Sequence, residues 1–258
     1  MYSRTSQRLP VLCICAATID FLQASPPGYL TKQETIAVLG VDDLRIRSLL
    51  DKNQFHDPLE EALNLGISSA TWPLFGLLWP SGQRMAERMA QRPVTDERIL
   101  EIGCGLGLSS LVAHRRGANV TASDCHPLTH AFLDENTRLN GLPRMAYRHG
   151  LWGTAALRED GLPVLTLAQD ANVSGVFDLI VGSDILYERD DEGTLASFIN
   201  SHAAQHSEIW VVDPNRGNRA AFHKHMARAG FAMHEHLLEQ AATLDQPAYK
   251  GRMLTYTR

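Results

Sequence analysis

A glycine-rich turn followed by an acid gives the first indication of chemistry in this chain. The stretch EIGCGLG places Gly103, Gly105 and Gly107 directly after an apolar run. Backbone without side chains at such a turn lets a ligand approach closely. Asp124 ends the next apolar run, 19 residues after Gly105, where a carboxylate can accept hydrogen bonds from both hydroxyls of a ribose. This spacing favours nucleotide binding over the alternative, a tight turn that packs a helix on a sheet with Asp124 as a solvated strand end.

A second acid, Glu101, indicates the charge of the ligand. It lies two residues before Gly103. A carboxylate there would repel a pyrophosphate and attract a cation, so we expect a ligand with a positive group such as a sulfonium. The dinucleotide pattern G-x-G-x-x-G would also need glycine at position 108, where this chain has Leu108. A dehydrogenase therefore fits less well.

A third acid follows another apolar run. The stretch VFDLIVG leads into SDILYE, so Asp184 and Tyr187 come just beyond a predicted buried strand. Ligands of open α/β sheets bind at the carboxyl ends of the strands, which makes both side chains candidates for substrate contact. The structural alternative is that Asp184 caps the following turn and Tyr187 packs beneath it.

Alternating strands and helices are needed to bring these groups together. From about residue 97 the chain alternates between short apolar runs and segments of helical spacing. Strands are predicted over 98–105, 119–124, 145–151, 176–184 and 208–214, and helices over 106–117, 127–140 and 218–230. Two further strands, 231–240 and 251–258, follow the last helix. The alternation predicts an α/β fold with a mostly parallel sheet covered on both faces.

The glycine turn and its acids resemble the first motif of the class I, seven-strand methyltransferases that use S-adenosyl-L-methionine. The resemblance covers roughly residues 75–258. It implies a Rossmann-like doubly wound sheet of order 3-2-1-4-5-7-6 with strand 7 antiparallel, and S-adenosyl-L-homocysteine as the product. It also implies a set of cofactor contacts. Asp124 would bind the ribose, Cys125 would lie near the adenine, and Leu151 and Trp152 would lie on the other side of that base. The remaining contacts would be Glu101, Gly103, Gly105, Gly107 and Ser183.

Two further stretches resemble the methyltransferase-16 family. FGLLWPSGQRMAERM contains a W-x-x-G pattern, Trp79 to Gly82, ahead of the first strand, and SDILY supplies a D-x-x-Y pattern, Asp184 to Tyr187. Characterised members of that family are mostly protein-lysine methyltransferases. The resemblance implies that Trp79 lines the cofactor, against the alternative of core packing. It also implies that Asp184 and Tyr187 are catalytic, with Asp184 orienting or deprotonating the amine and Tyr187 shaping its pocket.

The chain divides at the start of this resemblance. Residues 75–258 are expected to form the methyltransferase domain, and residues 1–74 a mainly helical N-terminal extension, because TKQETIAVLG reads as a helix. By analogy of fold the extension would cover the cofactor or select the substrate. A packing cap or a dimer contact are the alternatives.

The amino-acid composition limits the kinds of partner and ligand that this protein is expected to bind. A formal net charge of -5 over 258 residues argues against nucleic acid as the partner, and no apolar run approaches the roughly 18 residues of a membrane span. Cys13, Cys15, Cys104 and Cys125 lack zinc-site spacing and are expected to be reduced thiols in a cytoplasmic protein. His202 and His206 have helical spacing but are expected on a surface helix rather than at a metal, so we expect no metal.

Three functions are compatible with these patterns. The first is a protein-lysine methyltransferase, and the second is a methyltransferase for a small amine on the same scaffold. The third is a cofactor-binding protein without catalysis, or a dinucleotide-binding module. An adenine amino-methyltransferase of the N-P-P-Y type is disfavoured because the stretch reads SDILY. A protein substrate is expected, a small molecule is the alternative, and the oligomeric state is open.

Overall fold

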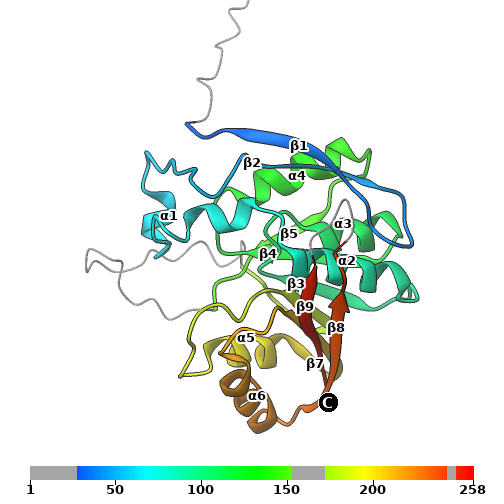
Figure 1. Cartoon of the computed structure of the whole chain (residues 1–258). Helices are drawn as coiled ribbons and strands as arrows, with labels where there is room; N and C mark the ends of the chain where they lie inside the picture. Colours follow the sequence, from blue (N-terminus) through cyan, green and yellow to red (C-terminus); the bar gives the residue numbers. More distant parts are fainter. Residues whose placement is uncertain (1–27, 153–171, 243–247) are drawn as a thin grey trace, which may run out of the picture.

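A seven-stranded sheet forms the centre of the molecule (Figure 1). The computed structural model describes residues 28–152, 172–242 and 248–258. The strands of the sheet are β3 (Arg98–Ile102), β4 (Asn119–Asp124), β5 (Ala146–His149), β6 (Phe177–Ser183), β7 (Ala203–Asp213), β8 (Ala232–Gln240) and β9 (Tyr249–Thr257). Their order is β5-β4-β3-β6-β7-β9-β8, with β9 antiparallel to both its neighbours. Counted within the sheet this is 3-2-1-4-5-7-6, so the predicted topology is confirmed.

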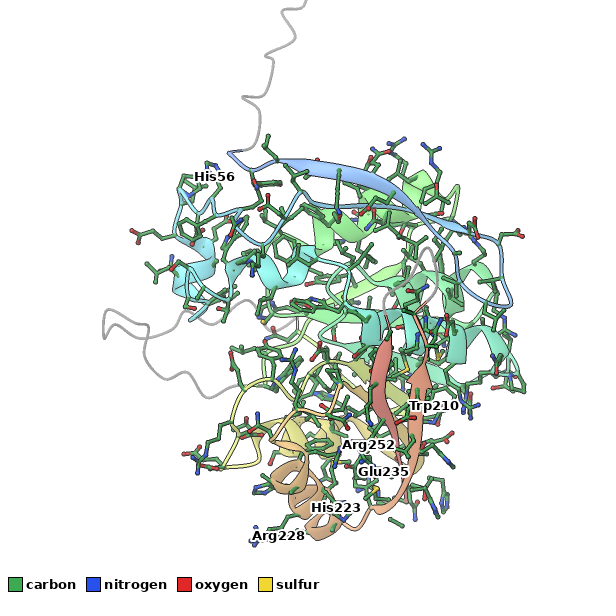
Figure 2. The ribbon with its side chains drawn as sticks, viewed as in Figure 1. His56, Trp210, His223, Arg228, Glu235 and Arg252 are labelled. Carbon is green, nitrogen blue, oxygen red and sulfur yellow. The ribbon has the colours of Figure 1, made fainter. Side chains whose placement is uncertain are left out.

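Helices cover both faces of the sheet. On one side lie α2 (Pro80–Gln91), α3 (Leu108–Arg115) and α4 (Thr129–Leu139), and on the other α5 (Thr194–His202) and α6 (Arg219–Arg228) (Figure 1). Strand residues alternate between the two layers. In β7, Trp210 and Val212 belong to the cluster of α2, α3 and α4, and Ile209 and Val211 to the cluster of α5 and α6. Trp210, labelled in Figure 2, also lies beneath the guanidinium of Arg92, 4.6 Å from its ring centre.

The described part of the N-terminal region is not mainly helical, so that prediction was wrong. Its main feature is an antiparallel hairpin of β1 (Thr31–Ile36) and β2 (Leu44–Leu49), and its helices are short, α1 (Glu61–Asn64) and the 3-10 helix η1 (Trp72–Gly76). In β2 the side chains of Leu44 and Ile46 are buried and that of Arg45 between them is exposed. This period of two suits a strand with one face on a core. TKQETI is an outer strand with mostly exposed side chains, and such a polar segment has no apolar helical face to bury.

Two asparagines of α4 connect the hairpin to the main domain. Asn136 and Asn140 lie one turn apart, and their side-chain oxygens accept hydrogen bonds from the backbone N–H groups of Arg47 and Arg45, at 2.7 and 2.9 Å. Their amide nitrogens donate to the carbonyls of the same two residues. These side chains therefore satisfy one edge of β2 as a neighbouring strand would.

Replacing Asn136 by alanine is expected to destabilise the protein by about 2 to 3 kcal/mol, because Asn136 is fully buried and its loss leaves the buried carbonyl of Leu106 and the half-buried backbone groups of Arg47 without this partner. Asn140→Ala provides the comparison. It is half-buried, water can replace its bonds, and a loss of about 1 kcal/mol or less is expected. Urea unfolding of both variants measures the difference, and equal losses would show that the two links are equivalent.

The histidines of HAAQH do not share a helix, which corrects a second expectation. His202 ends α5 and His206 lies in β7, because the backbone becomes extended at Ala203, where β7 begins beside β6. Among the described residues no group of three side chains could hold a metal ion. None of the helices in that part of the chain is long and apolar enough to cross a membrane.

Candidate active site

A cavity of about 1000 Å³ lies at the carboxyl ends of β3, β4 and β6. It is closed on one side by the segment that leads into α2. The residues predicted to bind cofactor or substrate lie together on its wall: Trp79, Glu101, Gly103, Gly105, Gly107, Asp124, Cys125, Leu151, Trp152, Ser183, Asp184 and Tyr187. The fold thus collects groups that are up to 108 positions apart in sequence, and their individual roles stay predictions.

The glycine turn follows β3 and needs backbone conformations that other residues avoid. Gly105 has φ of 51°, in the left-handed region, and a Cβ added to it would lie 2.8 Å from the carbonyl oxygen of Phe75. At Gly103, with φ of 58°, a Cβ would lie 3.1 Å from the ring of Trp152. The turn therefore presents bare backbone to the cavity, as close approach of a ligand requires.

Glu101 has a structural role that its sequence position did not predict. Its buried carboxylate accepts hydrogen bonds from the hydroxyls of Ser109 and Ser110 and from the N–H of Ser110, at 2.9 Å for the last. Burial raises the pKa of Glu101, and these bonds from the first turn of α3 oppose the rise. The carboxylate thus anchors the start of α3. An attraction between Glu101 and a cationic ligand stays a prediction.

Asp124 joins the end of β4 to the glycine turn. One carboxylate oxygen accepts the N–H of Gly105 and the other the N–H of His126, both at 2.9 Å. Burial raises the pKa of Asp124, and these two backbone bonds oppose the rise. The Thr129 side chain and the backbone of Cys125 act in the same direction. Asp124 therefore orders the turn, and its contact with a ribose stays a prediction.

A stacked pair of rings forms part of the cavity wall that the sequence did not indicate. The rings of Phe75 and His126 lie 3.8 Å apart and are tilted by only 12°. Burial lowers the pKa of His126 to about 3, so the ring is neutral at physiological pH. Its Nδ1 accepts the N–H of Leu128 at 3.2 Å, which places the proton on Nε2. No described residue accepts that proton.

Replacing His126 by phenylalanine is expected to reduce the sensitivity of the fold to acid. Because the folded pKa is depressed below the unfolded value of about 6.5, the contribution of His126 is present above that value and is lost as pH falls toward 3. Relative to the variant, the wild type should lose about 2 to 3 kcal/mol of unfolding free energy between about pH 7 and 4.5. Urea unfolding at the two pH values tests this. Glu101 and Asp124 are common to both proteins and cancel, and a difference independent of pH would contradict the prediction.

Trp79 stands at the mouth of the cavity rather than in the core. It is 36% exposed, and its indole N–H donates to the carbonyl of Leu74 at 2.9 Å. It precedes the first residue of α2, and Gly82 lies in the first turn of that helix, where a Cβ would approach the hydroxyl of Ser183 to 3.5 Å. The W-x-x-G stretch therefore places α2 against the end of β6.

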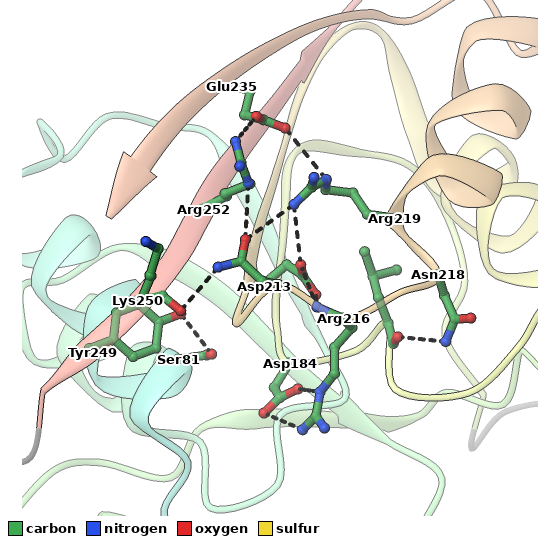
Figure 3. A network of polar contacts seen from close by, with 12 residues as sticks. Ser81, Asp184, Asp213, Arg216, Asn218, Arg219, Glu235, Tyr249, Lys250 and Arg252 are labelled. Atoms are coloured by element: carbon green, nitrogen blue, oxygen red, sulfur yellow. Dashed lines mark hydrogen bonds and ion pairs between the residues drawn. The ribbon is translucent and has the colours of Figure 1, made fainter. Parts of the chain in front are cut away.

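Asp184 is held at the end of β6 by its backbone and by an arginine. Its φ is 55°, and its N–H donates to the carbonyl of Val212 in β7 at 2.8 Å. Its carboxylate, 8% exposed, accepts the Nε and Nη2 hydrogens of Arg216 at 2.9 and 3.1 Å (Figure 3). The ion pair between Asp184 and Arg216 argues against the alternative that Asp184 only caps the following turn. Tyr187 is 44% exposed and so does not pack beneath the turn.

Arg216 is the main site residue that sequence reasoning missed. A signal was present, because Arg216 follows the predicted strand EIWVVDP and so had to lie at the carboxyl edge of the sheet. Cys104 and Cys125 carry free thiols and line the cavity, whereas Cys13 and Cys15 lie outside the described residues.

Known proteins match about half of the chain. The chain is 27% identical to the electron transfer flavoprotein beta subunit lysine methyltransferase of Mus musculus, over 56% of this chain and 51% of that protein. It is 30% identical to the histone-arginine methyltransferase METTL23 of Rattus norvegicus, over 46% and 50%. The protein N-lysine methyltransferase METTL21A of Danio rerio is 30% identical over 48% and 50%. The chain thus spans about half the length of the curated relatives it matches.

A solved structure and a family model extend the comparison. The structure of SMU.776 complexed with SAH superposes with a TM-score of 0.53 at 13% identity, over 92% of this chain and 57% of that one, which shows a shared fold. The family model described as lysine methyltransferase matches residues 76–229. This match covers more than half of the chain and includes the glycine turn, both strand-end acids and Arg216. The chain belongs to the lysine methyltransferase family.

Proposed function

We propose that this protein is an S-adenosylmethionine-dependent methyltransferase that methylates lysine side chains of another protein. The observation that carries the proposal is the single cavity in which the glycine turn, Asp124 and Asp184 meet at the ends of β3, β4 and β6. The names of relatives support the acceptor, since several are lysine methyltransferases. A cytoplasmic location stays a prediction.

The residues present fit the cofactor. Bare backbone at Gly103 and Gly105 suits its amino-acid part, the carboxylate of Asp124 in the cavity wall suits the ribose, and the apolar surfaces of Leu151 and Trp152 suit the base. When bound, S-adenosylmethionine supplies a methyl group attached to a sulfonium ion, and the sulfur is a neutral thioether once the methyl group has been transferred. The protein therefore has to bring a nucleophile into line with that group and exclude water.

Asp184 and Tyr187 are proposed to receive the amine. An amine would accept the methyl group through its nitrogen lone pair, so the nitrogen must first be uncharged. A solvent-exposed lysine has a pKa of about 10.4 and is almost wholly protonated at neutral pH. Asp184 can accept an N–H of the uncharged amine and fix the direction of its lone pair. Burial and Glu188 raise the pKa of Tyr187, so its hydroxyl stays protonated and can donate or offer its ring face.

Two other methyl acceptors are considered, and the labelling experiment described below distinguishes them from lysine. The histone-arginine relatives and the guanidinium already bound by Asp184 favour arginine as the second candidate. A small amine is the third.

Labelled S-adenosylmethionine tests the proposal directly. The protein is incubated with the labelled cofactor and a cell extract, proteins are separated from small molecules, and the protein fraction is hydrolysed to amino acids. Label in methyl-lysine is expected. Label in methyl-arginine, or only in small molecules, would show that the methyl acceptor is not lysine. Absence of S-adenosylhomocysteine binding by calorimetry would contradict the proposed methyltransferase function as a whole.

A further inference from the structure

We propose that Arg216 is a positioning residue that neutralises Asp184, so that the pocket selects the uncharged form of the acceptor amine. This inference rests on the proposed function. An isolated carboxylate beside the acceptor would stabilise the ammonium ion, which has no lone pair to attack. A fixed cation paired with that carboxylate removes this preference, and each carboxylate oxygen keeps a second lone pair that can accept an N–H.

The pairing geometry supports neutralisation rather than a passing surface contact. Two guanidinium hydrogens meet both oxygens of Asp184, the bidentate arrangement in which arginine binds a carboxylate most strongly. Asp184 is almost completely buried, whereas the side chain of Arg216 is 41% exposed. The arginine therefore approaches from the open side, and both residues line the cavity.

The loop that carries Arg216 is fixed on both sides. The N–H of Arg216 donates to the fully buried carboxylate of Asp213, at 3.0 Å for the nearer oxygen. Asn218 donates to the carbonyl of Leu186 at 3.0 Å, which ties the loop to the D-x-x-Y stretch (Figure 3). Asn215 has φ of 64° and accepts the Nε hydrogen of Arg252 at 3.0 Å. These hydrogen bonds therefore hold the loop in the conformation that brings Arg216 to Asp184.

Several other charged and titratable groups lie near Asp184, and most of them have partners of their own. Asp213 lies near Asp184 but is paired with Arg219, 3.9 Å away, which also contacts Glu235. Tyr187 and Tyr249 face Asp184 with neutral hydroxyls, since burial raises the pKa of both. Glu188, next to Tyr187, also lines the cavity, as do the acids of the following loop, Asp190, Asp191 and Glu192. Asp191 pairs with Arg189, and Asp190 accepts the N–H groups of Thr194 and Leu195. Arg216 is therefore the group that decides whether the acceptor meets a net negative charge at Asp184.

Butylamine provides a probe that needs no knowledge of the natural substrate. Its binding to protein saturated with S-adenosylhomocysteine is measured by NMR titration between about pH 7 and 9.5. For the wild type the affinity should rise about tenfold per pH unit, because the uncharged fraction of an alkylamine with a pKa of about 10.4 rises by that factor. In Arg216→Gln the ammonium ion should bind to unpaired Asp184, and the affinity should change less than about twofold over the range.

Two further variants separate charge from structure. Arg216→Lys keeps the positive charge but cannot form the bidentate pair, and it should keep most of the pH dependence that Arg216→Gln loses. Arg228→Gln removes the same charge from the exposed end of α6 (Figure 2) and should behave as the wild type. Equal pH dependence in the wild type and Arg216→Gln overturns the inference, as does a wild type that binds no butylamine. Failure of the wild type to bind S-adenosylhomocysteine removes the proposed function instead.

Discussion

Replacing Asp184 by asparagine is expected to lower kcat/KM for methyl transfer by about 100-fold or more while the affinity for S-adenosylhomocysteine stays unchanged. Asparagine has the same shape as aspartate and tolerates the left-handed backbone at this position, where φ is 55°. The fold of the strand end should therefore persist. What is lost is the negative charge that holds Arg216 and one of the two oxygens, which becomes an NH2 group that repels both the guanidinium and an N–H of the amine.

A matched variant and two measurements make this result specific. Asp134→Asn changes an exposed acid of α4 that pairs with Arg144, away from the cavity wall, and should keep full activity. Transfer of labelled methyl groups gives kcat/KM, and calorimetry gives the cofactor affinity. If Asp184→Asn keeps its activity, Asp184 has no part in catalysis. If it loses cofactor affinity as well, the residue supports the pocket as a whole.

The main domain could be predicted from sequence because its signals are local. Strands β3 and β6 and the second half of β7 are short apolar runs, the helices between the strands have apolar periodicity, and parallel strands need such crossovers. Residues at strand ends, such as Asp124 and Asp184, then fall on one edge of the sheet whatever the details of packing. The cavity and its candidate residues follow from that rule.

The missed features depend on contacts between distant segments. Arg216 lies 32 positions after Asp184, and the two meet because β6 and β7 are neighbours and because Asp184 adopts a positive φ. The hairpin of β1 and β2 is stabilised by Asn136 and Asn140, which lie about 90 positions downstream of their partners. The sequence places Arg216 at the carboxyl edge of the sheet but not specifically beside Asp184, and nothing in the residues of α4 indicates that they pair with β2. In both cases polar side chains satisfy groups that only the assembled fold brings within reach.

Replacing Gly105 by alanine is expected to weaken binding of S-adenosylhomocysteine by about 100-fold, or about 2.7 kcal/mol. The left-handed backbone alone costs alanine about 1 to 2 kcal/mol. In addition the new Cβ would lie 2.8 Å from the carbonyl oxygen of Phe75, and backbone cannot rotate away as a side chain can. Either the turn or η1 must move. Phe75 stacks on His126 in the cavity wall, so each movement changes the surface that receives the cofactor.

Gly141→Ala separates the clash from the backbone strain. Gly141 also has a left-handed backbone, with φ of 64°, but a Cβ there meets no atom within 4 Å, and Gly141 lies outside the cavity wall. This variant should lose about 1 to 2 kcal/mol of stability and bind S-adenosylhomocysteine as the wild type does. Calorimetry and urea unfolding on both variants give the two quantities. Normal cofactor affinity in Gly105→Ala would mean that the glycine turn does not contact the cofactor. Equal affinity losses in both variants would assign the effect to stability, because only Gly105 shares a surface with the cavity.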